Sequence, residues 1–194
     1  TVNTAVGENS LPANTTGSHN SAFGVGALFS NTTASYNTAV GRSALVANTT
    51  GAYNTAVGNE ALDALTTSNG STAVGYRALT ACTTATQNVG VGVLAGGAIT
   101  TGGNNTCIGY AAGDDITSGG QNVIIGSLNN AGNAGRAGLV ALGYSLSGGI
   151  NNALLFGYGS TDSQIAFGAN SITTPSDIRL KEDIQDEEVG LNFI

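Results

Sequence analysis

Few side chains of this 194-residue sequence could take part in catalysis or hold a metal ion. His19 is the single histidine, so neither a histidine-dependent catalytic triad nor a metal site with several histidine ligands can form. We interpret it as a variable surface residue, since Tyr36 and Tyr53 occupy the same place in the repeat described below. Cys82 and Cys107 fall at different phases of that repeat, so we expect no disulfide between them.

Three other patterns could be mistaken for chemical sites. Asp114 and Asp115 are adjacent acids without further ligands nearby, and we expect them to be solvated rather than to bind a cation. The glycines of GVGVLA at 90–95 belong to the repeat and lack a βαβ context, which argues against a nucleotide site. Ser176 and Lys181, taken alone, are a surface pair after a proline turn. We therefore expect no cofactor and no metal.

The composition argues against a conventional globular enzyme. The chain has 30 glycines, 6% aromatic residues and 9% charged residues, against about 25% charged residues in ordinary soluble domains. A mean hydropathy of +0.11 with so little charge also opposes disorder. The net charge of −7 argues against a nucleic-acid partner, and no apolar run is long enough for a membrane-spanning helix.

The body of the sequence is a regular 17-residue repeat. Segments of the form NTAVG recur, and each closes with a glycine at a constant spacing from the previous one. These glycines are Gly7, Gly24, Gly41, Gly58, Gly75, Gly92, Gly109, Gly126 and Gly143. Threonine, alanine and leucine occupy further positions at the same spacing. Such self-similarity is typical of stacked repeat proteins.

Each unit is expected to hold one short strand followed by turns. In NTAVG, Thr38 and Val40 lie on one face of the strand and Ala39 lies on the other. The Val40 position is apolar in every unit, so we expect it to face the interior. Gly41 suits a corner where φ is positive or backbones approach closely. We expect Asn48 and its equivalents to lie in turns or in the left-handed region.

One 17-residue unit cannot bury its own apolar side, so the units must stack. Stacking at about 4.8 Å per strand gives an all-β fold, a parallel β-solenoid of 17-residue coils. Threonine and asparagine would then lie in columns that form hydrogen-bonded ladders. Because the inward residues are small, we expect self-association along one flank to complete the burial.

Composition and spacing divide the chain into three parts. Residues 1–143 hold the regular repeat, and residues 144–175 are irregular terminal coils or a neck, since Gly157 and Gly168 follow at shortened intervals. Residues 176–194 form a tail after Pro175 that carries 8 of the 17 charged residues. The N-terminal TVNTAVG has no signal-peptide pattern, and we expect the sequence to start inside a longer protein.

The NTAVG and AL pattern of residues 1–143 resembles the head repeats of trimeric autotransporter adhesins, in which a short strand also ends in glycine. The unit here is longer than the familiar head unit. The resemblance implies a left-handed parallel β-roll that assembles as a homotrimer with a core shared between subunits. Similar repeats occur in bacteriophage tail fibres.

The segment SDIRLKEDI at 176–184 resembles the start of the intramolecular chaperone domain of endosialidase-type phage tailspikes and tail fibres. In that family the domain trimerises the fibre, assists its folding and removes itself by self-cleavage. The resemblance implies that Ser176 is the nucleophile, that Lys181 is its base and that the bond before Ser176 is cut; a hydroxyl nucleophile needs such a base. Asp177, Arg179 and Leu180 complete the motif.

The family's chaperone domain is much longer than the stretch 176–194 that is available here. We therefore expect residues 176–194 to be a truncated start of that domain, without cleavage activity. The apolar residues Leu180, Ile184 and Leu191 fall on one face of a predicted short C-terminal helix.

Tyr76, Tyr110 and Tyr144 each follow a strand-closing glycine and are spaced two repeats apart. Residues at this position are mixed in type, which predicts an exposed edge. Aromatic rings on a rigid solenoid are candidate glycan contacts, although we favour ordinary side-chain variety at a corner.

These observations predict a structural and adhesive segment of a phage tail fibre or tailspike. It would be extracellular on the virion, homotrimeric, not inserted in a membrane, and in contact with a host cell-surface glycan or receptor. The first alternative is the head of a trimeric adhesin on a bacterial cell surface. Two further alternatives are less favoured. One is a polysaccharide depolymerase, which would need clustered carboxylates. The other is an ice-binding solenoid, which the threonine columns suggest.

Overall fold

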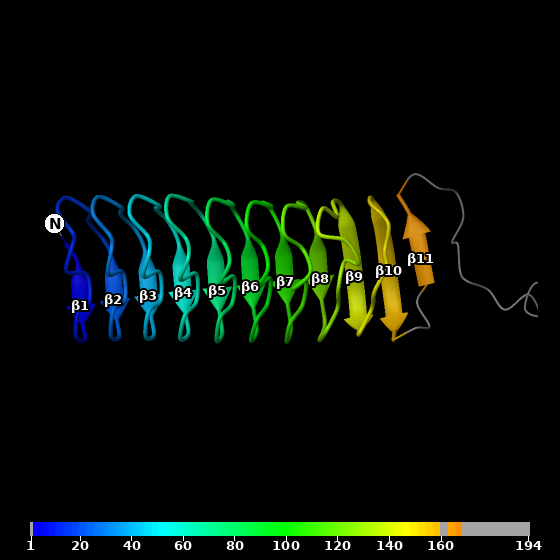
Figure 1. Cartoon of the computed structure of the whole chain (residues 1–194), viewed down its shortest axis with the longest axis horizontal. Helices are drawn as coiled ribbons and strands as arrows, with labels where there is room; N and C mark the ends of the chain where they lie inside the picture. The colour runs from blue at the N-terminus through cyan, green and yellow to red at the C-terminus, as the bar shows by residue number, and fades with distance from the viewer. Residues whose placement is uncertain (1, 160–162, 168–194) are drawn as a thin grey trace, which may run out of the picture.

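The structure, a computed structural model, describes residues 2–159 and 163–167, which are all-β and contain no helix. Figure 1 shows one coil of chain stacked behind another in a row, each contributing one strand to a single sheet. The strands are β1 (Thr4–Val6), β2 (Ser21–Phe23), β3 (Thr38–Val40), β4 (Thr55–Val57), β5 (Thr72–Val74), β6 (Val89–Val91), β7 (Thr106–Ile108), β8 (Val123–Ile125), β9 (Leu139–Tyr144), β10 (Ala153–Tyr158) and β11 (Ser163–Ala166). The predicted parallel β-solenoid is confirmed.

Each coil of the regular part is one sequence repeat. Strand β3 pairs in parallel with β4, and Thr38 lies opposite Thr55 and Val40 opposite Val57. The backbone outside the strands is paired along the stack as well, for example where the Leu45 N–H donates to the Ala61 carbonyl at 3.1 Å. Neighbouring coils therefore satisfy one another's backbone groups in the turns as well as in the strands.

The strands face the opposite way from the sequence-based expectation. Ala39 and its equivalents in β2–β10 are buried, whereas Val40 is 38% exposed and points outward. The interior has little room behind the strand: a methyl group added to Gly90, in the Ala39 position, would lie 2.8 Å from Cγ of Leu79. Leucines from the turns already fill this space, so the strand contributes alanine inward and its larger residues outward.

The inward side chains of one coil are mostly small, and its leucine adopts an uncommon backbone conformation. Leu45 is fully buried with φ of 53°, in the left-handed region. Two coils after Leu62, the residue equivalent to Leu45 is a glycine, Gly96, and its φ is also positive (60°). A methyl group on Gly96 would lie 3.0 Å from Cδ1 of Ile99. Ile99 stands where the first coils have a buried asparagine, and it fills the volume that the leucine leaves.

Asn48 does lie in a turn, where its N–H donates to the Leu45 carbonyl at 3.1 Å, but the expected alternative of a left-handed backbone at this residue is wrong. Asn48 is buried and lacks a positive φ, and its Nδ2 donates to the Gly51 carbonyl at 2.9 Å and to Oδ1 of Asn31 at 3.2 Å. A second buried asparagine, Asn54, donates to the Ser68 carbonyl at 2.8 Å and accepts from the Ser71 N–H at 2.9 Å. Because the turns bring backbone N–H and carbonyl groups into the thin interior, these groups need hydrogen-bond partners, and the asparagine side chains provide them.

The predicted threonine ladder is confirmed. The hydroxyl of each threonine in one column donates to the carbonyl of the threonine one coil further on, as from Thr32 to Thr49 at 3.1 Å and from Thr49 to Thr66 at 3.0 Å. The predicted glycine corner is confirmed too. Gly75 has φ of 132°, and a methyl group there would lie 2.5 Å from the Gly92 carbonyl oxygen.

The last coils change geometry. Strand β10 pairs with β9 in parallel, with Gly157 opposite Gly143, so this coil is shorter than the regular ones. Strand β11 then runs antiparallel to β10 (Figure 1) and ends the parallel order. The predicted helical tail, 176–194, lies outside the described residues.

We predict that Gly75→Ala lowers the free energy of unfolding by about 2 kcal/mol or more, because the added methyl group overlaps the next coil at an unfavourable φ. The matched control is Gly70→Ala. At that residue φ is 71° and an added methyl group would meet only Cγ of Gln87, at 3.6 Å, so about 1 kcal/mol is expected. Urea unfolding of both variants measures the difference, and equal losses would contradict the stacking described here.

We predict that Asn54→Ala lowers the free energy of unfolding by about 2–4 kcal/mol, because it leaves the Ser71 N–H and the Ser68 carbonyl buried without a partner. Thr67→Ala, at an exposed position outside the outward face of the strands, should cost under about 0.5 kcal/mol. The same unfolding assay compares the two, and a loss for Asn54→Ala as small as the control would refute a ladder of buried asparagines.

Candidate functional site

The most prominent surface feature of the solenoid is a column of outward apolar side chains, one from each of strands β1–β10. We call it the valine column. Most of its side chains are 36–56% exposed. It comprises Val6, Phe23, Val40, Val57, Val74, Val91, Ile108, Ile125, Leu142 and Phe156. At about 4.8 Å per coil the column is roughly 45 Å long. Scattered exposed apolar residues are ordinary, whereas continuous apolar stripes are typical of surfaces that bind a partner.

Two further columns widen this surface. One contains the residue two positions before each valine-column residue, such as Thr38, and the other contains the residue after each closing glycine. In β9 the three columns are seen together, because Val140, Leu142 and Tyr144 alternate with inward residues along one strand. We call the three columns the strand flank. Of its residues only Glu8 and Arg42 carry charge.

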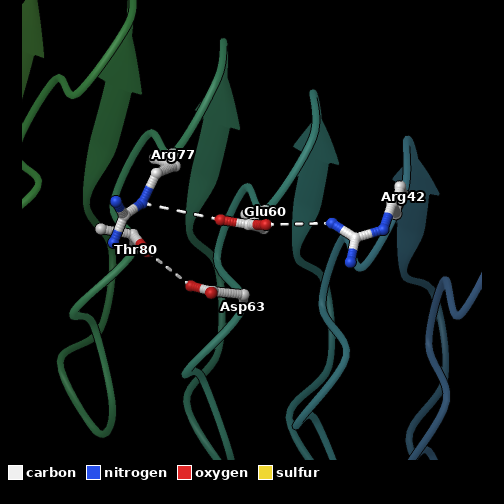
Figure 2. Close-up of polar contacts among 5 residues, drawn as sticks. All are labelled: Arg42, Glu60, Asp63, Arg77 and Thr80. Atoms are coloured by element: carbon white, nitrogen blue, oxygen red, sulfur yellow. Dashed lines mark hydrogen bonds and ion pairs between the residues drawn. The ribbon is translucent and has the colours of Figure 1, made fainter.

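The polar contacts of the acids next to the flank are shown in Figure 2. Glu60 lies between two arginines, with Oε1 3.1 Å from Nη1 of Arg42 and Oε2 3.7 Å from Nε of Arg77. Asp63, in the same coil, accepts a hydrogen bond from the Thr80 hydroxyl at 2.7 Å. The arginine side chains are about half exposed or more, so these ion pairs contribute little stability. They do pair the carboxylates along this edge with neighbours in adjacent coils.

The predicted glycan contacts lie on the strand flank. Tyr76, Tyr110 and Tyr144 are 45%, 53% and 43% exposed, which confirms the predicted exposed edge. Tyr144 also stacks on Tyr158 of the next coil, with ring centroids 5.0 Å apart. They lie beside the valine column on the same flank of the solenoid. Contact with a glycan stays a prediction.

Sequence reasoning missed a stack of aromatic rings at the other end of the strands. His19, Tyr36 and Tyr53 occur at the same position of three successive coils, each with φ near 60°. The rings of His19 and Tyr36 lie 4.8 Å apart and those of Tyr36 and Tyr53 lie 5.0 Å apart, nearly parallel in both pairs. The sequence does show aromatic residues recurring at the repeat spacing, which could have predicted the stack. The same recurrence is equally compatible with a surface position where residue types vary.

The two cysteines and the adjacent acids Asp114 and Asp115 have surroundings that suit a structural role. Cys82 and Cys107 are buried free thiols, as the phases predict. Asp115 accepts hydrogen bonds from the N–H groups of Ala131 and Gly132, at 2.9 and 2.6 Å, and so caps the turn of the next coil. Burial and the neighbouring Asp115 charge raise the pKa of Asp114.

Within residues 2–159 and 163–167, no group of three or more histidine, cysteine or acidic side chains is placed to hold a metal ion. The same residues include no helix that could cross a membrane. The motif residues Ser176, Asp177, Arg179, Leu180 and Lys181 lie outside the described part of the chain.

Comparisons with models of protein families, with curated proteins and with solved structures gave no match.

We predict that neither cysteine of the folded chain reacts with a thiol reagent at pH 8. Burial raises the pKa of Cys82 to about 11, and burial together with the Asp115 charge raises that of Cys107 to about 12, so the reactive thiolate is scarce and enclosed. Both should react in guanidinium chloride. Rapid reaction of one thiol in buffer would contradict its placement inside the coil.

Proposed function

We propose that this chain is a structural and adhesive segment of a phage tail fibre or tailspike, assembled as a homotrimer and extracellular on the virion. The observation that carries the proposal is the valine column. Its side chains are apolar in every coil, yet they point away from the interior. A partner that covers them must be long, straight and repetitive at the same pitch, and a second copy of this chain meets all three requirements.

Copies aligned in parallel place like coils beside one another along the full stack. The strand flank favours such contact, because it is nearly free of charge and because valine, phenylalanine and tyrosine pack well between subunits. The thin interior of each coil supplies the physical need, since burial of the flank adds the apolar area that the small inward residues lack. The trimeric stoichiometry and the left-handed winding of the roll rest on the resemblance to adhesin heads.

The choice of a phage fibre over a bacterial adhesin head rests on the SDIRLK segment at 176–181. Ser176 and Lys181 would belong to the self-cleaving chaperone that such fibres carry. We propose no enzymatic activity for the coils. A depolymerase would need clustered carboxylates, whereas Glu60 contacts two arginines and Asp63 contacts Thr80.

The ice-binding alternative also has weak support, because many of the threonine hydroxyls are already hydrogen-bonded within the protein. Hydroxyls of the Thr32 and Thr49 column are directed at carbonyls of the next coil. The adjacent column, which includes Thr33 and Thr50, is exposed, but a single row of hydroxyls does not make a two-dimensional lattice.

We predict that light scattering on a sizing column gives three times the chain mass of 19.1 kDa, and that Val57→Glu gives the single chain mass. A carboxylate in the valine column would be buried without a partner between copies, whereas in one chain the position is exposed. Thr67→Glu is the matched control at an exposed position outside the strand flank and should keep the threefold mass. A wild-type protein with the mass of a single chain would overturn the trimeric fibre.

A further inference from the structure

The ring stack opposite the closing glycines stops abruptly at one coil. We call the position that it occupies the ring column. Its residues in successive coils are His19, Tyr36, Tyr53, Gly70, Gln87, Asn104 and Gln121, with φ between 59° and 71°. The backbone therefore has the same local conformation in all of them, whether or not a ring is present.

Tyr53 is the last ring and its outer face is open. Tyr36 has a ring on each side and is 49% exposed, whereas Tyr53 is 65% exposed. The next residue of the column is Gly70, and a methyl group added there would meet only Cγ of Gln87, at 3.6 Å. The gap thus has Tyr53 on one side, Gln87 on the other and bare backbone between them.

The size of this gap matches one flat ring. Two coil spacings of about 4.8 Å separate Tyr53 from Gln87, so a ring midway lies about 5 Å from each. That is the separation between the stacked rings of His19, Tyr36 and Tyr53 themselves. The solenoid therefore leaves space for one more ring, and the stacked rings of the preceding coils define the position and plane of that space.

We propose that the gap at Gly70 is a subsite for one pyranose ring of a cell-surface glycan. The proposal rests on the proposed attachment function and gives it a location. The C–H face of the sugar would pack on the open face of Tyr53, and its hydroxyls would bond to the exposed amide of Gln87, which offers donors and an acceptor. A sugar fits better than a purely apolar ring, because one wall of the gap is aromatic and the other is polar.

The gap also stays outside the proposed interface between copies. Tyr53 precedes β4, and the buried Asn54 separates it from Thr55, the first residue of the strand flank in this coil. A glycan bound there would contact the fibre beside the line where copies meet. The three predicted contacts at Tyr76, Tyr110 and Tyr144 lie at the opposite end of the strands.

Gly70→Tyr tests the subsite, because a tyrosine would fill the gap with a fourth ring. The fold accepts the change, since Tyr36 and Tyr53 already have φ of 61° and the position is open. Gly70→Ala is the matched control, with a side chain too small to close the gap. Tyr53→Ala removes the stacking face, and Gln121→Ala removes an exposed side chain of the ring column away from the gap.

The fluorescently labelled full chain and each variant are applied to a printed array of bacterial lipopolysaccharide and capsule oligosaccharides. We expect the wild type, Gly70→Ala and Gln121→Ala to bind the same glycans, and Gly70→Tyr and Tyr53→Ala to bind them about tenfold more weakly. Binding by Gly70→Tyr equal to that of the wild type would overturn the subsite. So would a wild-type chain that binds no glycan.

Light scattering on the same samples separates failure of the subsite from failure of the proposed fibre. A threefold chain mass without glycan binding overturns the subsite alone, whereas a mass of 19.1 kDa overturns the trimeric fibre whatever the array shows.

Discussion

The spacing of about 4.8 Å between successive coils governs the structure, because it brings backbone against backbone over the whole circumference. At the corners this contact admits only glycine, as at Gly75, whose added methyl group would lie 2.5 Å from the Gly92 carbonyl oxygen. In the turns it brings polar groups into the interior, where Asn48 and Asn54 bond to them. The same residue must therefore recur at each level, which is why the sequence repeats.

The apolar exterior follows from this narrow interior. Leucines such as Leu45 enter from the turns and leave room for only a methyl group behind the strand, so Ala39 faces inward and Val40 faces outward. An ordinary sheet would bury its larger face in its own chain. Here that face stays exposed along the row of strands, and this exposure is the basis of the proposed association between copies.

The repeat length, the strands, the glycine corners and the threonine ladder could be predicted, because each depends on spacing or on local backbone chemistry. The inward face could not. Alternation in NTAVG defines two faces, and choosing the larger residue for the interior ignores the leucines that enter from the turns, such as Leu79 behind Gly90. The burial of Asn48 was missed for a related reason, since asparagine in a turn can be exposed or can be a buried partner of backbone groups. The direction of β11 depends on its pairing with β10, which no local pattern specifies.

For the candidate surfaces, too, some features could be predicted from the sequence and others needed the structure. The exposure of Tyr76 and Tyr110 was predictable from the mixed residue types of their column, whereas the ring stack needed the structure. Its recurrence at 36 and 53 was visible, but the gap at Gly70 has meaning only once those rings are known to be parallel and one coil apart. The tail motif at 176–181 is recognised by residue order alone and lies outside the described residues.

The most direct test of the account is methyl NMR of alanine and valine side chains with a water-soluble paramagnetic agent. In the single-chain Val57→Glu variant, the methyl groups of Val40 and Val74 should be broadened and those of Ala39 and Ala73 protected. In the wild-type assembly all four should be protected. Broadened alanines beside protected valines in the single chain would contradict the account, because the larger residues would then fill the interior and leave no apolar flank to cover.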